Sequence, residues 1–198
     1  MSYVFFNFKY IAENRFYTMS KKGITDAITS LKKCRNNYSL NIPKEKNLAK
    51  QVAYNLYDSV PVIWGVENST SAVALRWKQQ INENTKALAF SNFFPELNHN
   101  EIVGFEAPDE VVKRINILML HSKYDIQQIK TRMTRTKDIL TGRVKSIIDI
   151  NPQGETLLGE IFSLISLGDH ISVYLAYLYG NDPSQINYIR YLKNIKER

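Results

Sequence analysis

Short apolar runs that alternate with helical segments constrain the fold of this chain more than any other feature. The first run, residues 60–65, is almost wholly apolar and ends on glycine, which is typical of a strand buried in a parallel sheet. Small polar residues at 68–71 then offer N-caps for a helix over residues 71–82. The later segments are strands predicted at residues 87–91, 115–120 and 144–150, and a polar helix predicted over residues 125–140. Strands and helices that alternate in this way predict βαβ units in an open parallel sheet.

We therefore predict an α/β fold: a three-layer αβα parallel sheet of four or five strands with flavodoxin-like topology. The sheet domain is expected over residues 59–198, and residues 1–58 are expected to form a short helical segment before it. The helices predicted in that segment cover residues 2–14, a stretch capped by Thr25 and Asp26, and residues 47–57.

Two segments carry more apolar surface than one small domain easily covers. Residues 3–11 place aromatic side chains on a helix face, and residues 155–179 form a helix that is apolar nearly all round, with a bend expected near Gly168. We expect the long helix to be buried against the sheet or at a dimer contact, and a last helix to follow Asp182 and end at Lys193. The aromatic face and residues 171–179 together predict a dimer or a larger assembly.

Composition narrows the class of partner. The net charge of +7 is compatible with an anionic partner such as a phosphorylated sugar, a nucleic acid or an acidic lipid. The lysines and arginines are scattered, which favours a solvated basic surface over nucleic-acid binding. Cys34 is the sole cysteine and fits a reducing cytoplasm, and three dispersed histidines beside it do not suggest a metal site. We predict no membrane association, because charged and polar residues interrupt the longest apolar stretch.

Glu83 is the first candidate for acid–base chemistry. It lies at the end of the first crossover helix, between Asn82 and Asn84. A carboxylate that takes a proton from one carbon and returns it to the next can interconvert an aldose phosphate and a ketose phosphate. From position alone, an exposed carboxylate without a role is the more frequent case, so both interpretations stay open at this point.

His99 is the second candidate. It follows a predicted strand, and ligands bind at the carboxyl ends of parallel strands. Imidazole can move the proton that opens a pyranose ring. A histidine that caps a helix beginning near Asn100 is an equally good interpretation. For His121, also at a strand end, a structural role is favoured.

Two strings of sequence resemble one protein family. R-W-K-Q-Q-I-N-E-N at residues 76–84 and F-P-E-L-N-H-N-E-I at residues 94–102 are similar to the C-terminal sugar-isomerase (SIS) half of the bifunctional phosphoglucose/phosphomannose isomerases. The resemblance covers essentially the whole chain. It implies interconversion of glucose 6-phosphate or mannose 6-phosphate with fructose 6-phosphate, without a metal or nucleotide cofactor.

The same resemblance implies roles for three residues. Glu83 matches the carboxylate base, and His99 matches the ring-opening histidine, which the family contributes across a dimer interface. Lys193 matches a lysine that assists at the ring oxygen, although Lys196 competes for this role.

Substrate binding is predicted for Ser69, Thr70 and Arg76. The first two lie where free N–H groups at a helix start can bind an anion, although plain helix capping is favoured there. In the family, a preceding SIS subdomain supplies the phosphate loop and an arginine, and we expect neither in this chain. We therefore expect a truncated or split isomerase that acts as a homodimer or with a separate N-terminal SIS half. A non-catalytic sugar-phosphate-binding or assembly module with the SIS fold is the alternative.

Overall fold

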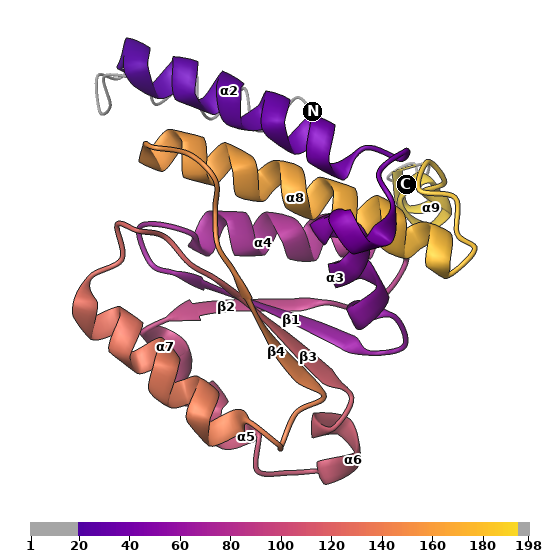
Figure 1. Ribbon diagram of the computed structural model, residues 1–198. Coiled ribbons are helices and arrows are strands. Elements are labelled where there is room, and N and C mark those ends of the chain that lie inside the picture. The colour runs from indigo at the N-terminus through magenta and orange to yellow at the C-terminus, as the bar shows by residue number, and fades with distance from the viewer. Residues whose placement is uncertain (1–19, 194–198) are drawn as a thin grey trace.

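The computed structural model describes residues 20–193 and shows a parallel sheet between layers of helices (Figure 1). Its four strands are β1 (Val60–Val66), β2 (Phe90–Phe94), β3 (Ile115–Leu120) and β4 (Ser146–Ile150). They lie in the order β2-β1-β3-β4, and each neighbouring pair is parallel. The predicted α/β fold is confirmed, and β1 lies inside the sheet because its residues are apolar on both faces.

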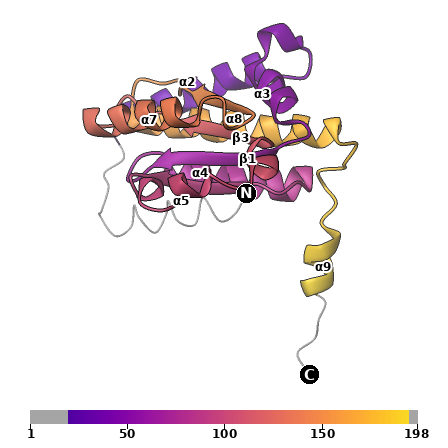
Figure 2. The same cartoon turned by 90° about the horizontal axis from the view of Figure 1, so that it is seen from below.

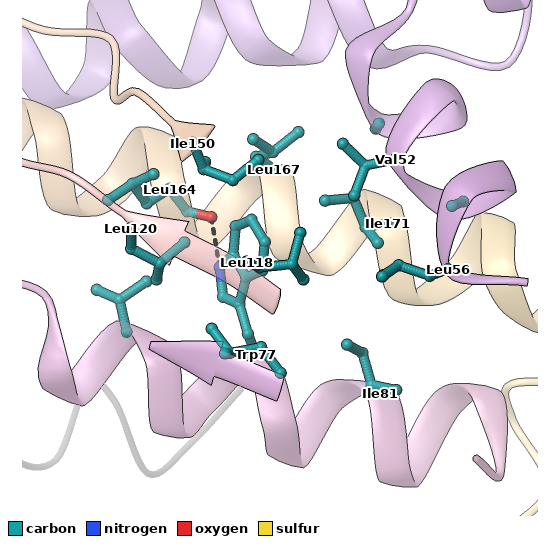
Figure 3. Close-up of a cluster of buried hydrophobic side chains, with 14 of the residues drawn as sticks. Val52, Leu56, Trp77, Ile81, Leu118, Leu120, Ile150, Leu164, Leu167 and Ile171 are labelled. Atoms are coloured by element: carbon teal, nitrogen blue, oxygen red, sulfur yellow. Dashed lines mark hydrogen bonds between the residues drawn. The ribbon is translucent and has the colours of Figure 1, made fainter. Parts of the chain in front are cut away.

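One face of the sheet is covered by two layers of helices. Helices α4 (Ser71–Gln80) and α8 (Leu157–Leu178) lie against the strands, and α2 (Lys21–Tyr38) runs along the outer side of α8 (Figure 1). Helix α3 (Leu48–Leu56) also packs on α8, after a 3-10 turn at Lys44–Lys46. The buried cluster between these elements is centred on Trp77, with Leu118 from β3 and Ile171 from α8 beside it (Figure 3).

The opposite face carries shorter elements and a second buried cluster. The 3-10 turn Glu96–Asn98 and helices α5 (Glu101–Gly104), α6 (Asp109–Val112) and α7 (Gln127–Leu140) cover it. Trp64, Phe94 and Leu97 are fully buried in this cluster. Both faces of the sheet are therefore closed by side chains of the same chain.

Helix α8 is the central packing element of this structure. Ile171 and Leu175 are fully buried by α2, α3 and α4, so this apolar helix is covered within one chain. The first of our two interpretations of residues 155–179 is confirmed, and these residues no longer argue for a dimer. Among the described residues, α8 is the one helix long and apolar enough to cross a membrane by length and composition, and its packing explains that composition.

The capping residue predicted for the second helix is wrong. Helix α2 begins at Lys21, and Ser20 caps it, because Ser20 Oγ accepts from the backbone N–H of Gly23 at 3.0 Å. Asp26 instead serves α8: its Oδ2 accepts from the backbone N–H groups of Glu155 and Thr156, at 2.9 and 2.8 Å. A carboxylate inside one helix thus anchors the start of another.

Strand β2 begins later than predicted. Helix α4 continues into a π-helical turn at Ile81–Thr85, and Lys86 then adopts a left-handed conformation with φ of 59°. The chain therefore crosses from the helical layer to the sheet before it becomes extended at Phe90.

Two further predictions concern the ends of the chain, and a third concerns its division into domains. The aromatic helix predicted at residues 2–14 lies outside the described residues. The predicted terminal helix is present as α9 (Asn187–Lys193). The division of the chain at residue 59 stays a prediction, and Cys34 of α2 and Leu56 of α3 belong to the same buried cluster as Leu118 of β3.

Candidate functional site

The π-helical turn presents Glu83 to solvent while its neighbours hold the turn in place. Asn82 Oδ1 accepts from the backbone N–H of Ala89 at 2.9 Å. Asn84 Nδ2 donates to Ser172 Oγ at 2.8 Å, and Thr85 Oγ1 donates to the carbonyl of Ser172 at 2.8 Å. π-Helical turns inside longer helices occur frequently at functional sites. The amides of the I-N-E-N motif are therefore structural, and its carboxylate is exposed.

A pocket of about 450 Å³ adjoins Glu83. Asn82, Glu83 and Lys86 line one side, and residues between Asn181 and Ile189 line the other. Lys86 Nζ holds the two sides together, because it donates to the carbonyls of Asp182 and Pro183 at 2.8 and 3.2 Å. Lys193 is one turn beyond Ile189 on α9, on the element that lines the pocket, but it is not itself a lining residue.

His99 lies at the far end of β2. It ends the 3-10 turn Glu96–Asn98 and is exposed, and its backbone N–H donates to the Glu96 carbonyl at 2.9 Å. Asn98 Nδ2 donates to Thr136 Oγ1 of α7 at 3.0 Å, which ties this turn to the second face of the sheet.

Glu101, beside His99 in the motif, has a structural role. Its carboxylate accepts from Trp64 Nε1 at 2.7 Å and from Asn92 Nδ2 at 2.5 Å.

A single chain does not bring Glu83 and His99 together. Asn82 is bonded to Ala89 just before β2, and His99 follows just after it, so the strand separates the two candidates. Five extended residues span roughly 16 Å. The Glu83 turn also packs on α8, on the α4 side of the sheet, whereas the His99 turn packs on α7.

The loop after β1 uses its hydroxyl groups internally. Thr70 Oγ1 donates to the Leu120 carbonyl at 3.1 Å and accepts from the backbone N–H of Val66 at 2.9 Å. Ser69 Oγ donates to Asp125 Oδ1 at 2.7 Å. The loop is tightly packed, since a Cβ at Gly65 would lie 2.7 Å from the Thr70 carbonyl oxygen. The predicted substrate role of Ser69 and Thr70 stays a prediction, and it would require these bonds to open.

Arg76 is held by an ion pair with α8. Its Nη2 contacts both carboxylate oxygens of Asp169 at 3.1 Å. Burial raises the pKa of the Asp169 carboxyl, and the charge of Arg76 opposes that rise. Within the described part of the chain, Arg76 Nε is buried without a hydrogen-bond partner. The substrate role predicted for Arg76 also stays a prediction.

Two buried carboxylates that the sequence did not reveal, Asp125 and Glu160, lie beyond the carboxyl ends of β1 and β3. Ser122 joins them: its backbone N–H donates to Asp125 Oδ2 at 2.8 Å, and its hydroxyl donates to Glu160 Oε2 at 2.5 Å. Glu160, one of the two acidic residues of the mostly apolar helix α8, was the signal that could have indicated this cluster. Ligands of parallel sheets usually bind beyond the carboxyl ends of the strands, but a phosphate would meet two carboxylates here. In residues 20–193, no group of three His, Cys, Asp or Glu side chains is placed to hold a metal ion.

Comparison with known families and proteins gives a consistent result. Residues 45–195 match the family model described as the bacterial phospho-glucose isomerase C-terminal SIS domain. The bifunctional phosphoglucose/phosphomannose isomerase of Caldicellulosiruptor bescii is 44% identical over 171 residues, which are 86% of this chain and 50% of that protein. The protein of the same name from Aquifex aeolicus is 34% identical, over 82% of this chain and 50% of its own length. The chain thus spans about half the length of the curated relatives it matches.

Solved structures show the same fold at lower identity. A glucose-6-phosphate isomerase like protein from Thermus thermophilus superimposes with a TM-score of 0.72 at 20% identity, over 85% of this chain and 56% of that one. Tagatose-6-phosphate ketose/aldose isomerase from Escherichia coli gives a TM-score of 0.58 at 11% identity, over 81% and 46%. At these identities the likeness concerns the fold.

Proposed function

Because the chain belongs to the family of bacterial phosphoglucose isomerase C-terminal SIS domains, we propose that it forms half of an aldose–ketose isomerase. The resemblance stated from the two sequence strings is confirmed. The proposed substrates are glucose 6-phosphate or mannose 6-phosphate, and the proposed product is fructose 6-phosphate. The observation that carries the proposal is the position of Glu83, an exposed carboxylate on a rigid turn beside a pocket of about 450 Å³.

The proposed reaction is proton transfer through an enediol. Glu83 takes the proton from C2 of the open-chain aldose and returns it at C1, and the hydroxyl proton of O2 is transferred to O1, which leaves a carbonyl at C2 and a hydroxyl at C1. One carboxylate serves both steps because the two carbons are adjacent. His99 opens the ring, and Lys193 assists at the ring oxygen.

Two features support an assembly larger than one chain. Glu83 and His99 lie at opposite ends of β2, so one active site needs Glu83 of one chain and His99 of another. The hydroxyls of the β1 loop are bonded internally, so the substrate phosphate needs a binding loop from elsewhere. A homodimer, joined by a separate N-terminal SIS half that holds the phosphate, meets both needs.

The experiment is a coupled assay of fructose 6-phosphate to glucose 6-phosphate, with and without an N-terminal SIS half supplied in trans. We expect the isolated chain to have a kcat/KM several powers of ten below that of the complemented pair, because a sugar whose phosphate is not bound is poorly positioned for the reaction. Each power of ten in kcat/KM corresponds to about 1.4 kcal/mol of lost transition-state stabilisation. Full activity from the isolated chain would contradict this expectation.

The choice of base is tested by Glu83→Gln. It should abolish the complemented activity and barely change the free energy of unfolding, because Glu83 is exposed. Glu110→Gln, an exposed carboxylate of α6, is the matched control and should retain full activity. A Glu83→Gln variant as active as wild type would show that another residue is the base.

A further inference from the structure

The pocket wall opposite Glu83 has little packing of its own. Residues between Asn181 and Ile189 form this wall, and they lead from the end of α8 into α9. Helix α9, described to Lys193, contains no buried residue, and Figure 2 shows it leading away from the helices that cover the sheet. Tyr188, which lines the pocket, is 89% exposed. Burial of apolar surface therefore does not fix this wall, and its position depends on polar contacts.

The side chain of Lys86 ties the Glu83 turn to this wall. Its Nζ donates to the carbonyls of Asp182 and Pro183, at 2.8 and 3.2 Å, in the segment before α9. It also donates to the carbonyl of Asn84 in its own turn, at 3.3 Å. An ammonium has three N–H groups, so each of them has a carbonyl partner here. Because a charged donor forms a stronger hydrogen bond than a neutral one, this contact can hold a segment that has no buried side chains in its helix.

The backbone around Lys86 is fixed on both sides. Lys86 follows the π-helical turn directly and has a left-handed conformation with φ of 59°, which a residue other than glycine seldom adopts. Thr85 before it donates to the Ser172 carbonyl of α8 at 2.8 Å, and its own carbonyl accepts from Asn181 Nδ2 at 2.7 Å. Unusual backbone conformations that the surroundings hold in place cluster at functional sites. The turn therefore projects the lysine toward the wall from a rigid base.

We propose that Lys86 is a positioning residue: it holds the segment that leads to α9 against the Glu83 turn, and so sets where Lys193 lies relative to the substrate. The proposal rests on the proposed function, in which Glu83 transfers the proton and Lys193 assists at the ring oxygen. Lys86 acts through the wall because its own N–H groups are occupied by carbonyls. A reacting group whose position is no longer fixed loses much of its effect on the rate.

Hydrogen–deuterium exchange on the full chain tests the contact without reference to activity. In Lys86→Met, the backbone amides of residues 181–193 should exchange about tenfold faster or more, because the wall opens more often. The matched control is Lys145→Met. Lys145 Nζ also donates to two carbonyls, those of Tyr57 and Asp58, at 3.1 and 3.3 Å, and it does not line the pocket. Exchange at residues 181–193 that is the same in wild type and Lys86→Met, or that is equally fast in both variants, would overturn the proposal.

A double-mutant cycle in the complemented assay tests whether Lys86 acts through α9. Lys86→Met should lower kcat about tenfold, the same size as expected for Lys193→Ala. Because both changes remove the same contribution, the double variant should lie within about twofold of the slower single variant. Two independent contributions would instead multiply to a loss of about 100-fold, and that result would overturn the proposal.

The conservative variant Lys86→Arg checks that the hydrogen bonds carry the effect. A guanidinium can donate to the same carbonyls, so kcat should lie within about threefold of wild type and exchange at residues 181–193 should be slow again. A Lys86→Arg variant with slow exchange but the low kcat of Lys86→Met would show that Lys86 does not act by holding the wall.

Exchange and activity together separate this proposal from the proposed function. Faster exchange in Lys86→Met with the kcat of wild type would overturn the proposal, because the wall would then be held without effect on the reaction. A wild-type pair without isomerase activity would count against the proposed function. Faster exchange in Lys86→Met would still support Lys86 as the residue that holds the wall.

Discussion

The indole of Trp77 occupies the space that a side chain at position 168 would need. A Cβ built on Gly168 would lie 2.3 Å from Trp77 Nε1, and that nitrogen donates to the Leu164 carbonyl at 2.8 Å (Figure 3). This contact joins α4 to α8. It therefore supports the turn that carries Glu83, which continues from α4 and is bonded to α8 at Ser172.

Gly168→Ala should destabilise the protein by about 3 kcal/mol, because the added methyl group overpacks a fully buried indole. Urea unfolding followed by tryptophan fluorescence measures the change. Gly104→Ala is the matched control: nothing lies within 4 Å of its Cβ position, so the change should stay within about 1 kcal/mol. Equal stability of the two variants would show that α4 and α8 are not packed as described.

His99→Asn should lower kcat of the complemented isomerase by about 100-fold, the size typical of a lost proton-transfer group. The free energy of unfolding should change little, because the imidazole is exposed and only the backbone N–H of His99 is hydrogen-bonded within its turn. A steady-state assay gives kcat, and chemical denaturation of the same variant gives the free energy of unfolding. A loss of activity that tracks a loss of stability would assign His99 a structural role.

Lys193→Ala should lower kcat about tenfold and leave KM nearly unchanged, since Lys193 is proposed to assist at the ring oxygen. Lys196→Ala is the matched comparison, because Lys196 competes for the same role. A larger loss with Lys196→Ala would transfer the role to that residue.

Thr70→Val should cost about 1–3 kcal/mol of stability, because the Leu120 carbonyl and the Val66 N–H lose a buried partner. Ser69→Ala should cost less, since Ser69 is only partly buried. Chemical denaturation and KM of the complemented enzyme are measured together. A raised KM at unchanged stability would show that these hydroxyls bind substrate rather than hold the loop.

Asp149 should make stability depend on acid pH. Burial by itself raises the pKa of the Asp149 carboxyl, but hydrogen bonds from Lys137 and from His121 Nε2, the latter at 2.7 Å, outweigh this and hold the pKa below its ordinary value. A carboxyl with a lowered folded-state pKa stabilises the protein above its unfolded pKa of about 3.9, and this stabilisation is lost as the pH falls through the folded pKa.

Asp149→Asn should therefore flatten the fall in unfolding free energy between about pH 5 and pH 2. Urea unfolding at a series of pH values gives the two profiles. Asp109→Asn serves as the control, because its ion pair with Lys113 is exposed on both sides. Parallel profiles for wild type and Asp149→Asn would contradict the assigned hydrogen bonds.

The sequence alone determined the local elements and the family. Strand β3 has the predicted limits because an apolar run bounded by polar residues needs no distant information. A helix over residues 47–57 was predicted from the helical spacing of its apolar residues, and the structure has it as α3 with Asn47 as its cap. The two strings around Glu83 and His99 identified the isomerase family because they are contiguous in the chain.

Only the tertiary structure decided what depends on contacts between distant residues. Asp26 binds the backbone just before α8 rather than capping its own helix, and Ser69 is bonded to Asp125, although neither partner is near in sequence. The place of Glu83 and His99 at opposite ends of β2 has the same origin. Sequence spacing gives the length of chain between two residues, but the path of that chain is set by how its helices and strands pack, and this packing separates the two residues.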